Sequence, residues 1–202
     1  MISPNSKPSV VAVILAGGKS SRMGEDKALI LWDGTPLLEK VCKVADECCQ
    51  QVYILTPWPD RYLSIVKKEY TFLLESNPGQ GPLVGLAEGL AQISADWVLL
   101  LACDLPLLDS IIIESWVSQL TQLPSDVFAF VPKQDRLWQP LCGFYRREAL
   151  PELQHFIDRG GRSFQTWLEQ VAVQVIPVDR QCSDMLWNCN TPNDLLASRG
   201  EA

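Results

Sequence analysis

Short apolar runs alternate with longer amphipathic segments over the first two-thirds of the chain. Five of these runs have the length and the apolar, often β-branched composition of strands that are buried on both faces. The predicted strands are Val10–Leu15, Val52–Thr56, Thr71–Leu74, Trp97–Cys103 and Val127–Val131. Because segments with helical spacing separate them, the pattern predicts an α/β fold with a mostly parallel central sheet and helices on both faces.

The segments between these strands carry helix start signals. After a turn at Asp33-Gly34, Thr35 is expected to cap a helix that has Pro36 at its first position and runs to about Cys49. The apolar face of this helix is predicted to contain Leu37, Leu38, Val41, Val44, Ala45 and Cys48. Helices are also predicted over Pro82–Ile93 and Asp109–Leu123, and Tyr62, Ile65 and Val66 lie at helical spacing.

The last third of the chain is less regular. Its predicted elements are a strand over Gln139–Tyr145, helices over Arg147–Phe156 and Ser163–Gln170, a strand over Val173–Val178, and a final helix capped by Thr191 with Pro192 at its first position. With 202 residues, of which 47% are hydrophobic, the chain is predicted to form one domain over residues 1–202. Residues 1–9 are predicted to be a disordered tail.

Composition excludes several classes of function. The net charge is −7 and the pI is about 4.7, which argues against a nucleic-acid or anionic-membrane binder. No stretch approaches the ~20 apolar residues that a membrane span needs. The seven cysteines show no C-x-x-C pair and no zinc-ligand spacing. They are therefore interpreted as reduced, small core residues of a cytoplasmic protein.

The first predicted strand leads into Gly17-Gly18, which is followed by the basic residues Lys19, Arg22 and Lys27. Ligands of open parallel sheets bind beyond the carboxyl ends of the strands, and glycine backbone with basic side chains suits phosphate there. The spacing fits neither the loop G-x-x-x-x-G-K-[ST] nor the dinucleotide fingerprint G-x-G-x-x-G. The stretch is interpreted as another kind of phosphate loop, with a merely solvated surface loop as the alternative.

Three later stretches carry candidate chemistry. Asp104 directly follows a predicted strand, where one carboxylate and substrate phosphates would suit Mg²⁺, or where the side chain could cap the turn at Leu105-Pro106. The loop Gly79–Leu83 is suited to pressing its backbone against a flat base, or to a tight turn. Asn188 and Asn190 precede the final predicted helix and are suited to capping it, to ligating a metal or to orienting a second substrate.

The segment Leu15–Ala28, LAGGKSSRMGEDKA, resembles the signature of the molybdenum cofactor guanylyltransferases. Further similarities follow in the order of that family. They are GPLVG at Gly81–Gly85, CDLP at Cys103–Pro106, QPL at Gln139–Leu141 and NCNTPNDL at Asn188–Leu195. Together they cover nearly the whole chain, which makes the resemblance far more specific than any single loop.

The resemblance implies a three-layer, Rossmann-like nucleotidyltransferase fold and a specific reaction. GMP would be transferred from GTP to Mo-molybdopterin, which gives molybdopterin guanine dinucleotide and pyrophosphate. Mg²⁺ would be the cofactor, and a protein that delivers molybdopterin is an expected partner. Because the pterin phosphate itself attacks the α-phosphorus, catalysis would consist mainly of positioning and charge neutralisation.

The same resemblance implies residue roles. Backbone contacts to the nucleotide are expected from Leu15, Ala16, Gly17 and Gly18, and phosphate contacts from Arg22 and Lys27. Asp104 would bind Mg²⁺, while Gly81 and Pro82, with Ser76 nearby, would contact the nucleotide base. Asn188 and Asn190 would face the pterin, one of them as a possible further metal ligand, and Arg162 is a weaker candidate for the pterin phosphate.

Two positions depart from the family pattern. Leu55-Thr56-Pro57 stands where an Asn is often found, and Glu75-Ser76 stands where an Asp often precedes the GPL loop. Both positions contact nucleotide in the family pattern, so base and ribose recognition is the open question. The alternatives are a cytidylyl- or sugar-phosphate nucleotidyltransferase and a non-catalytic nucleotide-binding module.

Overall fold

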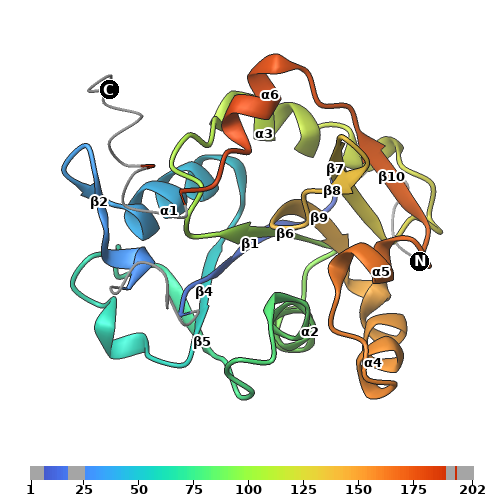
Figure 1. Ribbon diagram of the computed structural model, residues 1–202, viewed down its shortest axis with the longest axis horizontal. Helices are drawn as coiled ribbons and strands as arrows, with labels where there is room; N and C mark the ends of the chain where they lie inside the picture. The colour runs from blue at the N-terminus through green and yellow to red at the C-terminus, as the bar shows by residue number, and fades with distance from the viewer. Residues whose placement is uncertain (1–6, 18–25, 190–193, 195–202) are drawn as a thin grey trace.

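A twisted eight-stranded sheet forms the centre of the described structure (Figure 1). The structure is a computed structural model, and it describes residues 7–17, 26–189 and 194. The strands lie in the order β5–β4–β1–β6–β9–β7–β10, and β8 pairs with β7 beside this path. Their bounds are β1 (Val10–Leu15), β4 (Val52–Thr56), β5 (Thr71–Leu74), β6 (Trp97–Ala102), β7 (Ala129–Gln134), β8 (Leu137–Trp138), β9 (Cys142–Arg146) and β10 (Val173–Ile176).

The sheet is mostly parallel, as the sequence predicts. β1 pairs in parallel with both β4 and β6, β4 with β5, and β7 with β10. β9 is antiparallel to β6 and to β7. The reason is its connection: Asp135 and Arg136 have positive φ angles and form a tight hairpin, after which β8 and β9 return along β7. Without an intervening helix, the chain cannot make a parallel crossover here.

Helices cover both faces of the sheet (Figure 1). The helices on one face are α1 (Leu37–Cys48), α3 (Ser110–Val117) and α6 (Arg180–Met185), and those on the other are α2 (Pro82–Gln92), α4 (Leu150–Asp158) and α5 (Phe164–Leu168). Single 3-10 turns lie at η1 (Lys27–Leu29), η2 (Pro59–Arg61), η3 (Leu120–Gln122) and η4 (Arg147–Ala149). No helix within the described ranges is long and apolar enough to cross a membrane.

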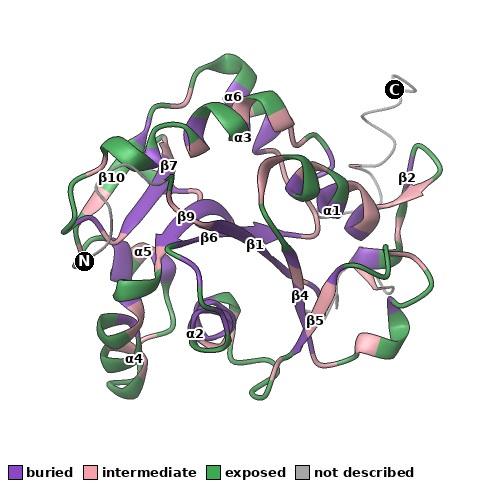
Figure 2. Ribbon diagram, turned by 180° about the vertical axis from the view of Figure 1, so that it is seen from behind, coloured by how far each residue is buried: buried purple, intermediate pink, exposed green. Residues whose placement is uncertain are grey.

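Each central strand supplies two cores, because its side chains point alternately to the two faces. In β1, Val10, Ala12 and Ile14 join the core under α1, α3 and α6. Val11 and Val13 join the core under α2, α4 and α5. Figure 2 shows the central strands buried and the outer faces of the helices exposed. This double burial explains why the sequence of β1 is apolar throughout rather than alternating.

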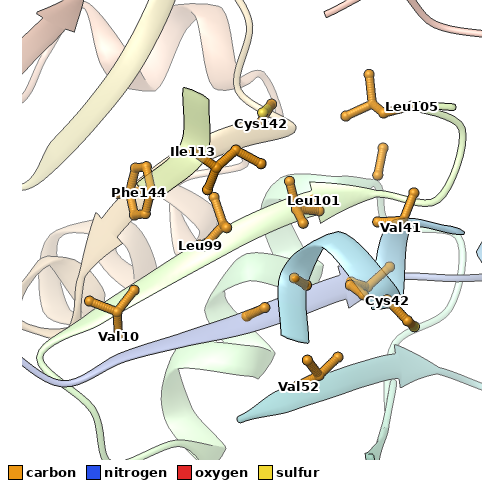
Figure 3. Close-up of a cluster of buried hydrophobic side chains, with 14 of the residues drawn as sticks. Val10, Val41, Cys42, Val52, Leu99, Leu101, Leu105, Ile113, Cys142 and Phe144 are labelled. Carbon is orange, nitrogen blue, oxygen red and sulfur yellow. The ribbon is translucent and has the colours of Figure 1, made fainter. Parts of the chain in front are cut away.

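Cysteines act as core residues, as predicted. Figure 3 shows Cys42 of α1 and Cys142 of β9 among the apolar side chains of the core under α1, α3 and α6. All seven cysteines lie in the described part of the chain, and all are free thiols. Burial, together with the nearby carboxylates of Asp46 and Glu39, raises the pKa of the Cys42 thiol to about 12. The thiol is therefore neutral and suited to apolar packing.

The predicted start of the first helix is wrong. Thr35 does not cap α1, because Thr35 and Pro36 form the short strand β3 (Thr35–Pro36), which pairs with β2 (Leu31–Trp32). The predicted turn at Asp33-Gly34 closes this hairpin and is confirmed. Helix α1 begins at Leu37, with Pro36 as an N-cap residue that makes no side-chain capping bond.

Other differences concern segments without a strong pattern. The helical spacing of Tyr62, Ile65 and Val66 reflects turns that follow η2, not an α-helix. Two prolines close to the start of that segment restrict its backbone. Helix α6 was not predicted, and Asp179 caps it by accepting a hydrogen bond from the Cys182 N–H at 2.8 Å.

The predicted N-terminal tail and the predicted final helix lie partly outside the described residues. The start of the final predicted helix, at Thr191 and Pro192, lies outside them, as do residues 1–6 of the predicted tail. Ser9 is firmly held, since its N–H and its hydroxyl both donate to Asp96 Oδ2, at 2.7 and 2.8 Å. The hydrogen-bonded part of the described chain therefore includes Ser9, just before Val10.

Gly89 of α2 faces Val13 of β1, and this packing gives a first prediction. A Cβ at this position would lie 3.4 Å from Val13 Cγ1, an ordinary contact. We expect Gly89→Ala to raise the free energy of unfolding by up to about 1 kcal/mol, because alanine favours the helix. Gly89→Leu, the matched larger variant, should lower it by about 1–3 kcal/mol through overpacking. Urea denaturation measures both, and a loss of stability in Gly89→Ala would contradict this packing.

Candidate functional site

A cavity of about 460 Å³ opens where the carboxyl ends of β1, β4, β5 and β6 meet. β4 and β6 flank β1 on opposite sides, while the following helices α1 and α2 cover opposite faces. This is the topological switch point at which open α/β sheets bind ligands. The residues that line it are Leu15, Ala16, Gly17, Asp26, Lys27, Leu55, Trp58, Glu75, Pro78, Gly79, Gly81, Pro82, Gly85, Ala102, Cys103, Asp104 and Leu141.

An ion pair lies in this cavity. Lys27 Nζ is 3.0 Å from Asp104 Oδ2, and the two side chains are only 20% and 17% exposed. Asp104 is the second residue after the end of β6, whereas Lys27 is the first residue of η1. The two charges therefore come from segments 77 residues apart in the sequence. Partial burial strengthens their attraction relative to a pair in open solvent.

The second oxygen of the Asp104 carboxylate is the clearest candidate metal ligand. Oδ1 is buried and has no hydrogen-bond partner among the described residues. A buried carboxylate oxygen without a partner is unfavourable, and a hard cation would satisfy it. No group of three or more His, Cys, Asp or Glu residues suited to a metal occurs in the described ranges. One carboxylate fits Mg²⁺ when substrate phosphates and water supply the remaining oxygens.

Glycine is required where β1 ends. Gly17 has a φ of +131°, and an added Cβ would lie 2.8 Å from Pro57 Cδ. The backbone of Leu15, Ala16 and Gly17 is thus exposed to the cavity without a side chain over its last residue. Across the cavity, α2 begins with Pro82, and the positive end of its dipole favours a bound anion.

The structure brings most of the predicted nucleotide-binding residues together. The cavity lining includes Leu15, Ala16, Gly17, Lys27, Gly81, Pro82 and Asp104. Gly18, Arg22 and Asn190 lie outside the described residues. Residues from three motifs that are far apart in sequence therefore share one cavity.

Three predicted residues that the structure describes do not line the cavity: Ser76, Asn188 and Arg162. The Ser76 N–H donates to Glu88 Oε2 at 2.9 Å, outside the lining. Asn188 donates to the Leu186 carbonyl, but the next N–H, of Cys189, donates to the Asp104 carbonyl at 2.9 Å. This bond keeps the Asn188 segment beside the end of β6.

Arg162 has a structural task. Its guanidinium donates to the carbonyls of Ile157 and Gly161, at 2.8 and 2.7 Å, and so satisfies backbone groups at the end of α4. Its Nε also reaches Gln80 Oε1 at 3.4 Å, which connects it to the loop before α2. Any role toward a second substrate would have to compete with these bonds.

Sequence reasoning missed Asp26 and Trp58 as parts of the lining, and within the segment Glu75-Ser76 it selected Ser76 where the structure has Glu75. Glu75 directly follows β5 and Asp104 is the second residue after β6, so both carboxylates lie just beyond the carboxyl end of a strand. This position was the available signal for Glu75. Burial, with a smaller contribution from the Glu88 carboxylate, raises the pKa of Glu75. Trp58 had no such signal, because only the fold of the segment after β4 brings it over Gly17.

Comparisons with known proteins point to one family. The model of the MobA-like NTP transferase domain matches residues 12–173. A probable molybdenum cofactor guanylyltransferase of Trichormus variabilis is 49% identical over 193 residues, which are 96% of this chain and 92% of that protein. The molybdenum cofactor guanylyltransferase of Pseudomonas entomophila is 34% identical, over 94% of this chain and 97% of that protein.

Solved structures show the same fold. The molybdopterin-guanine dinucleotide biosynthesis protein A from Archaeoglobus fulgidus superposes with a TM-score of 0.77 at 24% identity, covering 94% of this chain and 96% of that one. A CMP:2-keto-3-deoxy-manno-octonic acid synthetase complexed with CTP has a TM-score of 0.74 at 16% identity, covering 95% and 97%. The predicted three-layer, Rossmann-like nucleotidyltransferase fold is confirmed.

The raised pKa of Glu75 gives a prediction about pH. A carboxyl whose pKa is raised in the folded state holds its proton more tightly there than in the unfolded chain, so its contribution to stability is lost as the pH rises above 4.5. We expect Glu75→Gln to remove this loss. Its stability relative to the unchanged protein should increase from about pH 4 to about pH 7. Denaturation across this range tests it, with the exposed Glu69→Gln as control, and a flat difference would contradict it.

Proposed function

The chain belongs to the MobA-like NTP transferase family, and on this premise we propose that it transfers GMP from GTP to Mo-molybdopterin, forming molybdopterin guanine dinucleotide and pyrophosphate. The observation that carries the proposal is the cavity at the switch point, where the motifs that define the resemblance meet around the Lys27–Asp104 pair. Its volume of about 460 Å³ suits a nucleotide-sized ligand.

The cavity suggests how GTP is held. The backbone of Leu15, Ala16 and Gly17 forms one wall for the nucleoside and the phosphates. Lys27 supplies a mobile positive charge for the phosphate oxygens, and the α2 N-terminus adds a favourable dipole. We assign Gly18 and Arg22 the same phosphate-binding task on the strength of the motif alone.

The proposed reaction needs no nucleophile from the protein. An oxygen of the terminal phosphate of the pterin forms a bond to the α-phosphorus of GTP, and the bond to the pyrophosphate oxygen breaks. Lys27 leaves Asp104 for the phosphates and neutralises charge on the departing pyrophosphate. Asp104 would hold Mg²⁺ through the oxygens of its carboxylate, and bound Mg²⁺ supplies further charge neutralisation. The remaining contribution is alignment of the two phosphates.

Guanine selection is assigned to Glu75 together with Gly81 and Pro82. Guanine presents two adjacent donors, N1–H and the 2-amino group, and an ionised carboxylate accepts both. Glu75 is the carboxylate that follows β5 and lines the cavity close to the start of α2. Cytosine offers no such adjacent pair. Glu75 would thus serve in place of the Asp that the family pattern often has near this position.

The pterin side of the reaction is assigned to the C-terminal segment. Asn188 is anchored beside the end of β6 by the Cys189 bond to Asp104, and Asn190 is assigned the same role from the motif. A protein that delivers molybdopterin is part of this proposal, since the pterin must reach the cavity already loaded with molybdenum. The free cysteines support a reducing, cytoplasmic compartment.

Turnover with different nucleotides tests the proposal. We expect pyrophosphate release that requires both GTP and Mo-molybdopterin. ITP lacks the 2-amino group of guanine and should react with a kcat/KM about 10- to 100-fold lower, because one donor to Glu75 is missing. The difference should shrink in Glu75→Gln. A preference for CTP would replace the guanylyl assignment, and nucleotide binding without pyrophosphate release would indicate a non-catalytic module.

Variants of the ion pair separate the proposed metal binding by Asp104 from the proposed charge neutralisation by Lys27. We expect Asp104→Asn to lower Mg²⁺-dependent turnover by about 100-fold or more while the protein stays folded. Lys27→Ala should lower kcat more than it weakens GTP binding, because its charge is most needed as pyrophosphate leaves. Asp126→Asn, an exposed carboxylate before β7, is the control. Normal turnover in Asp104→Asn or Lys27→Ala would remove that residue from the site.

A further inference from the structure

Tyr62 joins the connection after β4 to the loop that carries Lys27. Its side chain is fully buried in the core under α1, α3 and α6. Its hydroxyl donates to Asp26 Oδ2 at 2.7 Å, across 36 residues of sequence. A buried aromatic ring has few alternative positions, so the hydroxyl is a fixed point for its partner.

Asp26 connects the Tyr62 hydroxyl to the turn that begins at Lys27. Its second oxygen, Oδ1, accepts the Ala28 N–H at 3.1 Å, and its carbonyl accepts the Leu29 N–H at 3.0 Å. These bonds cap the 3-10 turn η1, of which Lys27 is the first residue. Both carboxylate oxygens of Asp26 are thus engaged, one by the turn and one by Tyr62. From this turn Lys27 reaches Asp104 Oδ2 at 3.0 Å.

The charges around Asp26 favour this arrangement. Arg61 lies 3.8 Å from Asp26 Oδ2, and its guanidinium stacks 4.1 Å above the ring of Trp58 in the cavity wall. Burial and the Asp26 carboxylate both raise the pKa of Tyr62, so its hydroxyl keeps its proton and remains a donor. A lysine has a long, flexible side chain, so the position of its ammonium depends on how firmly its backbone is held.

We propose that Tyr62 is a positioning residue for GMP transfer, which holds Lys27 at the phosphates by fixing Asp26 and the turn that begins at Lys27. This role rests on the proposed function. Tyr62 itself does not line the cavity. Its effect reaches the reaction only through Asp26 and Lys27.

The test is the conservative variant Tyr62→Phe, which keeps the buried ring and removes the hydroxyl. We expect kcat for Mg²⁺-dependent pyrophosphate release from GTP and Mo-molybdopterin to fall about tenfold, because a small displacement of an aligned charge is costly in the transition state. The Kd for GTP should change by less than about twofold. The matched control is Tyr70→Phe, a buried tyrosine in the same connection between β4 and β5, which should leave kcat and Kd unchanged.

A double-mutant cycle separates positioning from a general structural role. If Tyr62 acts through Lys27, adding Tyr62→Phe to Lys27→Ala should change kcat by less than about twofold. An equal, tenfold loss in both backgrounds would overturn the proposal, as would a normal kcat in Tyr62→Phe alone. Should Tyr62→Phe fail to fold, Asp26→Asn replaces it, since the asparagine Oδ1 still caps the turn whereas its amide nitrogen, in the place of Oδ2, cannot accept the hydrogen bond from the Tyr62 hydroxyl.

The failure of the proposed function is a different result. If the unchanged protein releases no pyrophosphate from GTP with Mo-molybdopterin, both the reaction and the role of Tyr62 are overturned. If the unchanged protein turns over normally and Tyr62→Phe does too, only the role of Tyr62 is overturned. The unchanged protein thus serves as the reference for the proposed reaction. Tyr70→Phe serves as the reference for removing a buried tyrosine hydroxyl from this connection.

Discussion

The burial of β1 on both faces is the constraint on which the rest of the structure depends. β1 pairs in parallel with β4 on one side and β6 on the other, and its side chains enter both cores. Because neighbouring strands and helices surround β1, only the residues beyond its two ends can reach a ligand. The chain that leaves its carboxyl end must therefore emerge between the ends of β4 and β6. Gly17 and Asp104 come together for that reason, and a cavity between them follows from the order of the strands.

Two charged side chains, Lys27 and Asp104, lie in the cavity beside the end of β1. Lys27 and Asp104 neutralise each other in a partly buried place, and a polyphosphate with a hard cation can take over both partners. This explains how an acidic chain, with a net charge of −7, can hold a highly charged nucleotide. The attraction is local and supplied by a few aimed groups, so it does not require a positive net charge. Tyr62 and Asp26 extend this local arrangement into the core.

The errors of the sequence reading have one origin. Thr35 is a residue type that often caps helices. Here it is part of the β2–β3 hairpin, where it pairs with Trp32 and does not cap α1. Tyr62 has helical spacing from Ile65 and Val66, but its place is decided by a core contact and by Asp26. In both cases a helix signal worth about 1 kcal/mol yields to a competing interaction of equal or greater size, a hairpin for Thr35 and long-range contacts for Tyr62.

The sequence alone determined the strands, most helices, the mostly parallel sheet and the family. Uninterrupted apolar runs need burial on both faces, and the motifs keep their residue types because phosphate and metal chemistry need them. It also placed Lys27, Asp104 and Gly81 as nucleotide-binding candidates. Only the tertiary structure decided that Glu75, Trp58 and Asp26 share their cavity, and that Ser76 and Arg162 are engaged elsewhere. Contacts between residues distant in sequence depend on strand order and packing, which no local pattern encodes.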